Sequence, residues 1–520
     1  MTSVLREELI STIDALLEKY SDNAPLLQRL KHQIITILPH TLEEYSKDHV
    51  KRENRKKELT MQSEKCISGF IVKENIYYAP NNELFLKYDG THFTPYSEDN
   101  IQHDILTQVT AQHDLRPWKQ RIKNNVITRI KRRSPLAIIP ESNTIQYVMS
   151  QLYPAVFPTR NRAKYFLTVV GDIILSKNTE LVYIANPCLK QLIVDIAQQA
   201  YLYFGITGGL QQIKYKFYDH SFKNTRLLCK ISSISDIKIA FQEMNLFKHM
   251  IDLLCVSVHY SNRYKSSDDF LKKHQHSESE LYKHARFLAN HTIDDIVQEF
   301  IKKYIKILPD GNGKIASNDM IFIWRKYILS LGIPNVVFYG SLHAILRTKL
   351  TYDSVADTYC GITSIFLPQI SNFSRFWEST IKEADDSEIE LDEIPGLFAY
   401  WNGRNKTPTD NAFSSPEIFL DLIRHFYPFI EIEDDKYIGI SCSLWDKTTE
   451  VKQALERFKT TQSQDTERSI NGAYLFYATS EERERVVSKR FFERLAVEVL
   501  DNYIDDDSGL IDSKWFEAIS

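Results

Sequence analysis

Glycine is scarce in this chain, and the scarcity limits the folds that are open to it. The 520 residues include only 16 Gly, about 3% where about 7% is usual. Tight turns and phosphate-binding loops depend on glycine because it reaches left-handed backbone angles without strain. The sequence therefore favours helices, and it predicts a mainly α, multidomain fold with small β elements, an α+β protein.

Charge and hydropathy indicate a soluble globular protein. Lys and Arg total 64, Asp and Glu total 68, the net charge is −4, and 43% of the residues are hydrophobic. No stretch approaches the roughly 18 uncharged apolar residues of a membrane span. Arg6, Glu7 and Glu8 interrupt the region where a secretion signal would need its apolar core. The six cysteines form no CxxC pair, which predicts reduced thiols in a cytosolic setting and no zinc module.

The spacing of hydrophobic residues changes along the chain. A helical period over 5–20 and 27–38 predicts a helical hairpin, and a charged helix follows. Over 68–96 the period becomes two, and Asn81-Asn82 and Asp89-Gly90 are hairpin-turn pairs, so we expect a small β-meander there. A helix over 416–426, strands at 429–432 and 437–440, and a helix from 448 are compatible with a winged-helix-like module.

These patterns predict five segments. They are 1–66 (helical hairpin and charged helix), 67–157 (β-meander and basic helical region), 158–350 (mixed α/β, then helical middle domain), 351–395 (connector whose acidic run, 383–393, is a linker) and 396–520 (winged-helix-like module and helical tail).

Tests for catalytic motifs are negative. Gly311-Asn312-Gly313-Lys314 lacks the features of a Walker A loop, because Leu308 replaces the first Gly and Ile315 the Ser or Thr. Acidic pairs at 268–269, 294–295, 434–435 and 505–507 fit helix starts and turns better than metal sites.

Five histidines between 259 and 291 also fit a solvated helix-loop-helix better than a zinc site. They are His259, His274, His276, His284 and His291. No nucleophile elbow is present. We therefore predict no catalytic residue, metal ligand or cofactor, although an unrecognised enzyme stays open.

The strongest signal is a basic helix free of acidic residues over 116–133. Trp118, Ile122, Val126 and Ile130 recur every four residues, which gives this helix a stripe to bury and leaves the rest of its surface cationic. Such a surface can neutralise phosphates, a contact independent of sequence that weakens with salt. Docking of the basic face on an acidic neighbour, such as 383–393, is the alternative.

Two further basic patches follow the basic helix. Over 214–226, cations alternate with aromatic rings, a pattern that suits single strands because bases stack on rings; the same rings could instead be core. Cations over 160–164 open a helix after Pro158, where they oppose the helix dipole and where a bound anion would explain them. The candidate nucleic-acid contacts are Arg116, Lys119, Arg121, Lys123, Arg129, Lys131, Arg132, Arg133, Arg160, Arg162, Lys164, Lys214, Tyr215, Lys216, Phe217, Lys223 and Arg226.

Several sequence blocks between about 68 and 460 resemble a giant-virus, mimivirus-like family described as highly derived relatives of the poxvirus-type primase-helicase. The blocks are PESNTIQY at 140–147, AKYFLT at 163–168 with Gly171-Asp172, VHYSNRY at 258–264, FWE at 376–378, and HFYP at 425–428 leading through DKY at 435–437 to LWDK at 444–447. The resemblance implies viral DNA replication, a primase-like part and a hexameric ATPase. This chain departs from that pattern because it has no Walker A loop, so no catalytic residue is carried over.

These observations lead to two expectations. The first is a non-catalytic nucleic-acid-binding protein of a large DNA virus that acts in genome replication or nucleoprotein assembly, binding DNA or RNA through its basic surfaces. The second is an interaction scaffold in a viral translation, transcription or virion complex. Either would have viral protein partners and no membrane, and would reside in the viral factory of the host cytoplasm or in the virion.

Overall fold

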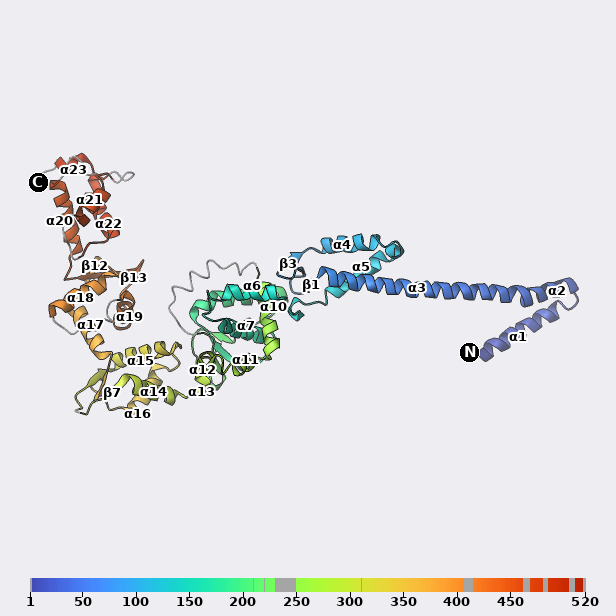
Figure 1. Cartoon of the computed structure of the whole chain (residues 1–520), viewed down its shortest axis with the longest axis horizontal. Coiled ribbons are helices and arrows are strands. Elements are labelled where there is room, and N and C mark those ends of the chain that lie inside the picture. The colour runs from blue at the N-terminus through green and yellow to red at the C-terminus, as the bar shows by residue number, and fades with distance from the viewer. Residues whose placement is uncertain are drawn as a thin grey trace. The chain divides into compact units, whose positions relative to one another are not determined.

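A computed structural model describes residues 2–208, 210–218, 220–229, 249–309, 311–405, 415–461, 468–479, 485–504 and 510–517. The chain is mainly helical with small sheets, as the sequence predicts (Figure 1). It divides into an N-terminal unit, 1–292 with 332–336, and a C-terminal unit, 293–331 with 337–520. The division falls inside the predicted 158–350 segment. No helix among the described residues combines the length and apolar character needed to cross a membrane.

Helices dominate the N-terminal unit. They are α1 (Thr2–Lys19), α2 (Ala24–His32), a π-helical turn (Gln33–Ile37), α3 (Leu38–Glu74), α4 (Glu98–Thr110), α5 (Lys119–Ile130), α6 (Ser142–Leu152), α7 (Arg160–Ile174), α8 (Lys190–Phe204), α10 (Met250–Tyr264), α11 (Ser267–Lys273), α12 (Ser279–Ala285) and α13 (Phe287–Asn290). Short 3-10 helices cover His113–Trp118, Pro135–Ala137, Pro187–Leu189 and Phe222–Asn224. The strands are β1 (Ile76–Ala79), β2 (Leu84–Tyr88), β3 (Phe93–Tyr96), β4 (Val182–Ile184), β5 (Ile213–Lys214) and β6 (Thr225–Leu227).

The predicted N-terminal hairpin takes a different form. Its second helix continues through the π-helical turn into α3, so that the predicted charged helix is part of one long run (Figure 1). Within the fully described range 3–62, no residue is buried. The apolar stripe that predicted a packed hairpin is therefore open to solvent, with Leu5 and Leu9 each more than half exposed.

The predicted β-meander is confirmed. Strands β1, β2 and β3 form an antiparallel sheet in sequence order, with Tyr77 opposite Leu86 and Leu86 opposite Pro95. Alternation sends Ile76 and Phe85 into a core shared with α3, α4 and α5, and it sends Leu86 into a second core that includes Ile251 of α10.

Helix α7 is the central element of the N-terminal unit. Ten consecutive residues from Tyr165 to Ile174 are buried, and α10 packs along the helix. Beside the two helices lies a small parallel sheet of order β5-β4-β6. Strands β5 and β6 both pair with β4 and not with each other, because each one follows a crossover connection.

The C-terminal unit carries the remaining elements. Its helices are α14 (Ile293–Tyr304), α15 (Ser317–Leu331), α16 (Tyr339–Lys349), α17 (Leu367–Thr380), α18 (Glu393–Asn405), α19 (Pro416–Phe426), α20 (Lys447–Thr460), α21 (Ile470–Thr479), α22 (Lys489–Leu500), a 3-10 helix (Asp501–Tyr503) and α23 (Ser513–Glu517). Its strands are β7 (Ile305–Ile307), β8 (Lys314–Ala316), β9 (Tyr352–Asp353), β10 (Thr358–Cys360), β11 (Ile362–Ser364), β12 (Ile381–Glu390), β13 (Ile432–Glu433) and β14 (Lys436–Cys442).

The acidic run was expected to be a linker, and this expectation is wrong. Residues 383–390 belong to strand β12, which pairs antiparallel with β14 in a sheet of order β12-β14-β13. A buried ion pair explains the difference, since Glu388 Oε1 lies 2.6 Å from Lys436 Nζ and Glu388 Oε2 lies 2.7 Å from Arg494. Partners distant in sequence therefore neutralise charge that looks solvated when the run is read alone.

Neither glycine cluster forms a phosphate loop among the described residues. Gly311, Asn312 and Gly313 join β7 to β8 and lead into a strand instead of a helix. The second cluster, Gly205 with Gly208 and Gly209, follows α8 in the sequence, and Gly205 ends that helix as a left-handed C-cap at a φ of +64°. Asp310 and Gly209 lie outside the described ranges.

Candidate nucleic-acid interface

The predicted basic helix is confirmed over α5, Lys119–Ile130, while Arg116 lies in the preceding 3-10 helix and Lys131 to Arg133 follow the end of α5. Several of these cations are engaged within the protein. Ile122, Val126 and Ile130 of α5 are fully buried against α3 and α4. Arg129 pairs with Glu64 of α3 at 2.7 Å. Arg133 donates to the carbonyl of Ile71 at 2.9 Å and to the Tyr77 hydroxyl at 3.1 Å. The acidic neighbour of this helix is therefore on α3 of the same unit.

Other cations of the basic helix stay on the surface. Arg116, Lys119, Arg121, Lys131 and Arg132 are exposed. Arg116 donates to the Thr110 carbonyl, Arg121 lies over the Trp118 ring at 4.8 Å, and Lys131 lies 5.6 Å from the Tyr78 ring. Lys123 is half-buried and reaches Gln102 at 3.4 Å. These side chains leave a shallow cationic surface suited to contacts that do not depend on sequence.

The rings and cations over 214–226 do not form one exposed surface. Phe217 is buried and meets Phe222 edge-on at 5.4 Å, and burial raises the pKa of the half-buried Tyr215. Arg226 is 4% exposed and makes a two-pronged hydrogen bond with Asp268, both contacts at 2.8 Å. Of the four rings in this segment, Phe217 is buried, Tyr215 and Phe222 are half-buried, and Tyr218 is 58% exposed, so only part of the aromatic surface belongs to the core. Lys216 and Lys223 remain exposed, and Lys214 is half-buried.

The cations at the start of α7 belong to a pocket that brings three positively charged side chains together. Arg160 and Lys164, one turn apart, line a pocket of about 240 Å³ together with Arg263 of α10. The rest of the wall is Ser142, Ile145, Gln146 and Met149 of α6 with Tyr260 of α10. Arg162, the third predicted cation here, points elsewhere and lies 3.5 Å from Glu280. Two of the three predicted cations are thus joined by one from a distant helix.

The electrostatics of this pocket are one-sided. Among the described residues, no carboxylate pairs with Arg160, Lys164 or Arg263; Arg160 and Arg263 have only ring contacts, with Tyr153 at 5.7 Å and Tyr264 at 5.8 Å. Burial lowers the pKa of Lys164, and the charges of Arg263 and Arg160 lower it further. The pocket therefore concentrates positive charge that an anion would relieve.

Close packing of α7 on α10 fixes this arrangement. Gly171 gives the helices room to approach, since a Cβ at this position would lie 2.1 Å from the Ser257 carbonyl oxygen. The buried Asp172 accepts hydrogen bonds from the Ser261 hydroxyl and the Ser267 amide, both at 2.6 Å, and so anchors the end of α10. Arg263 follows Ser261 by two residues and is therefore held beside Lys164.

Sequence reasoning did not identify Arg263, which is the pocket's third cation. It lies about 100 residues after Arg160 and Lys164, in a segment without a basic cluster. The only sequence signal was its place in the 258–264 block of the family resemblance.

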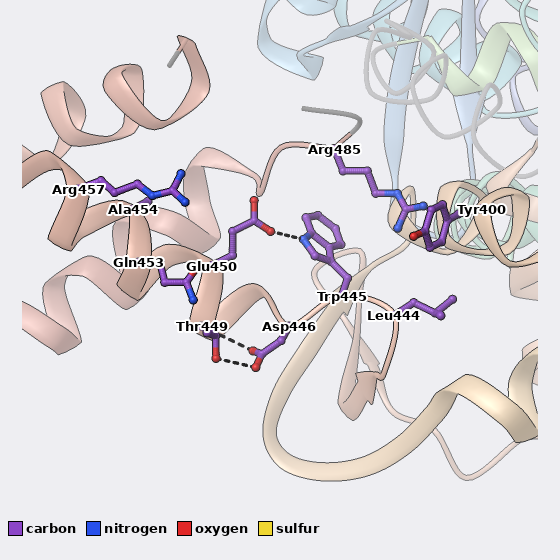
Figure 2. Close-up of a pocket in the computed structure, with 10 residues that line it drawn as sticks. All are labelled: Tyr400, Leu444, Trp445, Asp446, Thr449, Glu450, Gln453, Ala454, Arg457 and Arg485. Atoms are coloured by element: carbon purple, nitrogen blue, oxygen red, sulfur yellow. Dashed lines mark hydrogen bonds between the residues drawn. The ribbon is translucent and has the colours of Figure 1, made fainter. Parts of the chain in front are cut away.

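Figure 2 shows a larger pocket in the C-terminal unit, with a volume of about 470 Å³. Arg485 lies over the Tyr400 ring at 4.4 Å, and Trp445 Nε1 donates to Glu450 at 2.6 Å (Figure 2). Asp446 caps α20 by accepting from the amide and the hydroxyl of Thr449. Charges of both signs line this pocket, so it does not favour a polyanion.

The histidines between 259 and 291 do not converge. His274 and His291 each bond through Nδ1 to the carbonyl four residues earlier, at 2.9 and 2.8 Å, and His284 lies 3.2 Å from the Gly332 carbonyl. The acidic pairs at 268–269 and 294–295 lie in first helical turns, as predicted. The 434–435 pair lies in the β13–β14 turn, and 505–507 is outside the described residues.

Comparison with known proteins gives no further identification, because no protein-family model, no curated protein and no solved structure matches this chain.

Proposed function

We propose that this chain binds nucleic acid through its phosphates, with the pocket of Arg160, Lys164 and Arg263 as the principal contact. The supporting observation is three cations around one small cavity without a carboxylate partner among the described residues. Holding like charges together costs free energy, mainly at the half-buried Lys164 because Arg160 and Arg263 are exposed, and a phosphate would repay it through charge-assisted hydrogen bonds.

The size of the pocket indicates how the polymer would bind. About 240 Å³ suits a phosphate group better than a nucleotide with its base. Tyr260 in its wall is buried, so it offers no free face for stacking. We therefore favour contact with the sugar-phosphate backbone, which does not depend on sequence. The exposed cations of α5, Lys119 and Arg121 among them, would add weaker contacts.

Binding should be measured by fluorescence anisotropy with single-stranded DNA, duplex DNA and RNA over a series of salt concentrations. The test variant carries Lys164→Glu and Arg263→Glu, and the matched control is Lys190→Glu, which changes an exposed cation at the start of α8. Losing two phosphate contacts should lower the slope of log K against log salt by about 1.4 to 1.8 and weaken binding at least about tenfold. If the double variant binds as tightly as the control, the proposal fails.

We also propose that this chain acts in a large DNA virus. The resemblance described above supports a role in genome replication or nucleoprotein assembly of a large DNA virus, located in the viral factory or the virion. The missing Walker A loop supports a binding role over an ATPase role.

We also propose a winged-helix-like module over 367–442. The order α17, β12, α18, α19, β13, β14 and the sheet order β12-β14-β13 support this topology. In this topology α19 would be the recognition helix. However, Asp421 of α19 lies 3.0 Å from Arg325 and 2.6 Å from Lys326 of α15. The wing turn carries Asp434 and Asp435. Both features favour a protein contact over a duplex contact.

An interaction scaffold is the second candidate function. The solvent-exposed apolar residues of α1 to α3, such as Leu5, Leu9 and Leu42, favour it because exposed apolar surface often marks a protein contact. Recovery of one protein in a pull-down that resists salt, with no retention of the chain on nucleic acid, would support this function and contradict the first.

A further inference from the structure

Two histidines and one aspartate meet where the β-meander touches α10. His92 lies in the turn before β3, His249 is the residue just before α10, and Asp252 lies in the first turn of α10. His92 Nδ1 is 2.6 Å from Asp252 Oδ2, and His249 Nδ1 is 3.7 Å from the same oxygen. One donor atom from each residue lies within 4.8 Å of the other two. Residues about 160 positions apart thus form one cluster.

The carboxylate in this cluster is deeply buried. Asp252 has no exposed surface, and its Oδ1 accepts the Phe93 amide at 3.0 Å. Its charged or titratable partners are the two imidazoles; no Lys or Arg pairs with it among the described residues. With both imidazoles neutral, the cluster keeps one buried negative charge, which is costly unless a cation compensates it.

The imidazole rings of His92 and His249 are arranged so that both Nδ1 atoms face the same carboxylate. His92 and His249 stack at 3.9 Å between centroids with a tilt of 26°, and Tyr147 meets both rings edge-on. Each histidine presents Nδ1 to the same carboxylate oxygen. His92 Nδ1 is within hydrogen-bond distance of that oxygen, whereas His249 Nδ1, at 3.7 Å, approaches it without making a hydrogen bond.

The distances suit a small divalent ion. In a tetrahedral zinc site with ligand bonds of about 2.0 to 2.1 Å, donor atoms lie roughly 3.3 Å apart. The two distances to Asp252 Oδ2, 2.6 Å from His92 Nδ1 and 3.7 Å from His249 Nδ1, differ from that value in opposite directions by less than 1 Å. Small rotations of the two rings would therefore open a central position, and the Phe93 amide would hold the carboxylate as an outer-shell partner.

We propose that His92, His249 and Asp252 form a binding site for a divalent transition metal, with Zn²⁺ as the ion. Two imidazoles and one carboxylate are ligands that Zn²⁺ prefers, and a water molecule or another ligand would complete four-coordination. The ion would clip the β2–β3 turn to the start of α10, at the edge of the core that contains Phe93 and Ile251. This site is independent of the proposed phosphate pocket.

The test uses the full-length chain after treatment with a chelator and removal of the chelator. Zn²⁺ is titrated by calorimetry, and Co²⁺ is titrated by its visible absorption, which reports coordination geometry. The variants are His249→Ala and Asp252→Asn, and the matched control is His259→Ala, which removes a half-buried histidine of the same helix outside the cluster. Circular dichroism and thermal unfolding without metal show whether each variant is folded.

The parent and His259→Ala should bind one ion per chain and gain thermal stability with Zn²⁺. His249→Ala and Asp252→Asn should bind at least about 100-fold more weakly and lose the Zn²⁺-dependent rise in melting temperature. The proposal is overturned if the stripped parent binds neither ion, or if folded His249→Ala binds as tightly as the parent. In either case the cluster is a buried hydrogen-bond network alone.

Discussion

Replacing Gly171 by Ala should force apart the two helices that build the N-terminal unit. The new Cβ would lie 2.1 Å from the Ser257 carbonyl oxygen, 2.6 Å from the Ser257 carbonyl carbon and 2.8 Å from Ser261 Cβ. Ordinary contacts begin near 3.4 Å, and two of the three obstacles are backbone atoms that cannot rotate away. Helix α7 must therefore retreat from α10 by about 1 Å or more.

The free energy of unfolding should fall accordingly. Overpacking a close-packed core costs about 1 to 3 kcal/mol and occasionally more, and backbone obstacles place this site at the upper end. Ala gains about 1 kcal/mol over Gly in a helix interior. The net destabilisation should be at least about 2 kcal/mol. Because Lys164 is on α7 and Arg263 is on α10, separating the helices should also weaken nucleic-acid binding.

Urea unfolding and hydrogen exchange resolved for the peptides of α7 and α10 would measure this effect. Gly69→Ala is the matched control, since Gly69 is also inside a helix, α3, but its Cβ would meet nothing within 4 Å. That variant should keep or gain up to about 1 kcal/mol of stability. If Gly171→Ala is as stable as the parent, with unchanged hydrogen exchange in α7, then α7 and α10 do not approach as closely as described.

Three further outcomes follow from the buried charges. Arg226→Met should lower the free energy of unfolding in urea by up to about 3 to 5 kcal/mol, because the half-buried Asp268 would lose its charged partner. Burial alone would raise the pKa of Asp268, but hydrogen bonds and charge from Arg226 outweigh it and hold this pKa below its usual 3.8. Its stabilising contribution is therefore present above about pH 4 and lost as pH falls through the lowered pKa, so Asp268→Asn should flatten the acid limb of a stability–pH curve. In the C-terminal unit, Glu388→Gln should lower the thermal unfolding temperature, because Lys436 would lose its buried counter-charge; an unchanged melt would contradict this reading of the ion pair.

The sequence pattern predicted the structure correctly wherever the structure depends only on residues close together in the chain. The period of two and the turn pairs after Tyr78 and Tyr88 predicted the β-meander, because alternation alone sorts such residues between two faces. The buried stripe of α5 was predicted for the equivalent reason at helical spacing. Both signals are complete within about twenty residues.

Local pattern failed where partners come from elsewhere in the chain. The acidic run became strand β12 because Lys436 and Arg494 neutralise Glu388. Within the aromatic segment over 214–226, Phe217 became part of the core because residues distant in sequence pack around it. Arg226 was predicted as a phosphate contact, yet it serves a buried ion pair whose acid lies 42 residues away.

The sequence by itself determined the helical character, the meander and the presence of basic segments, since glycine content, hydrophobic period and charge runs are local properties. The tertiary structure decided which cations share a site. Arg263 joins Arg160 and Lys164 only because Gly171 lets α7 and α10 approach and Asp172 anchors the end of α10. In the same way, His92 meets His249 and Asp252 only where the meander packs on α10. Each site depends on contacts between distant segments, and no local period or composition encodes them.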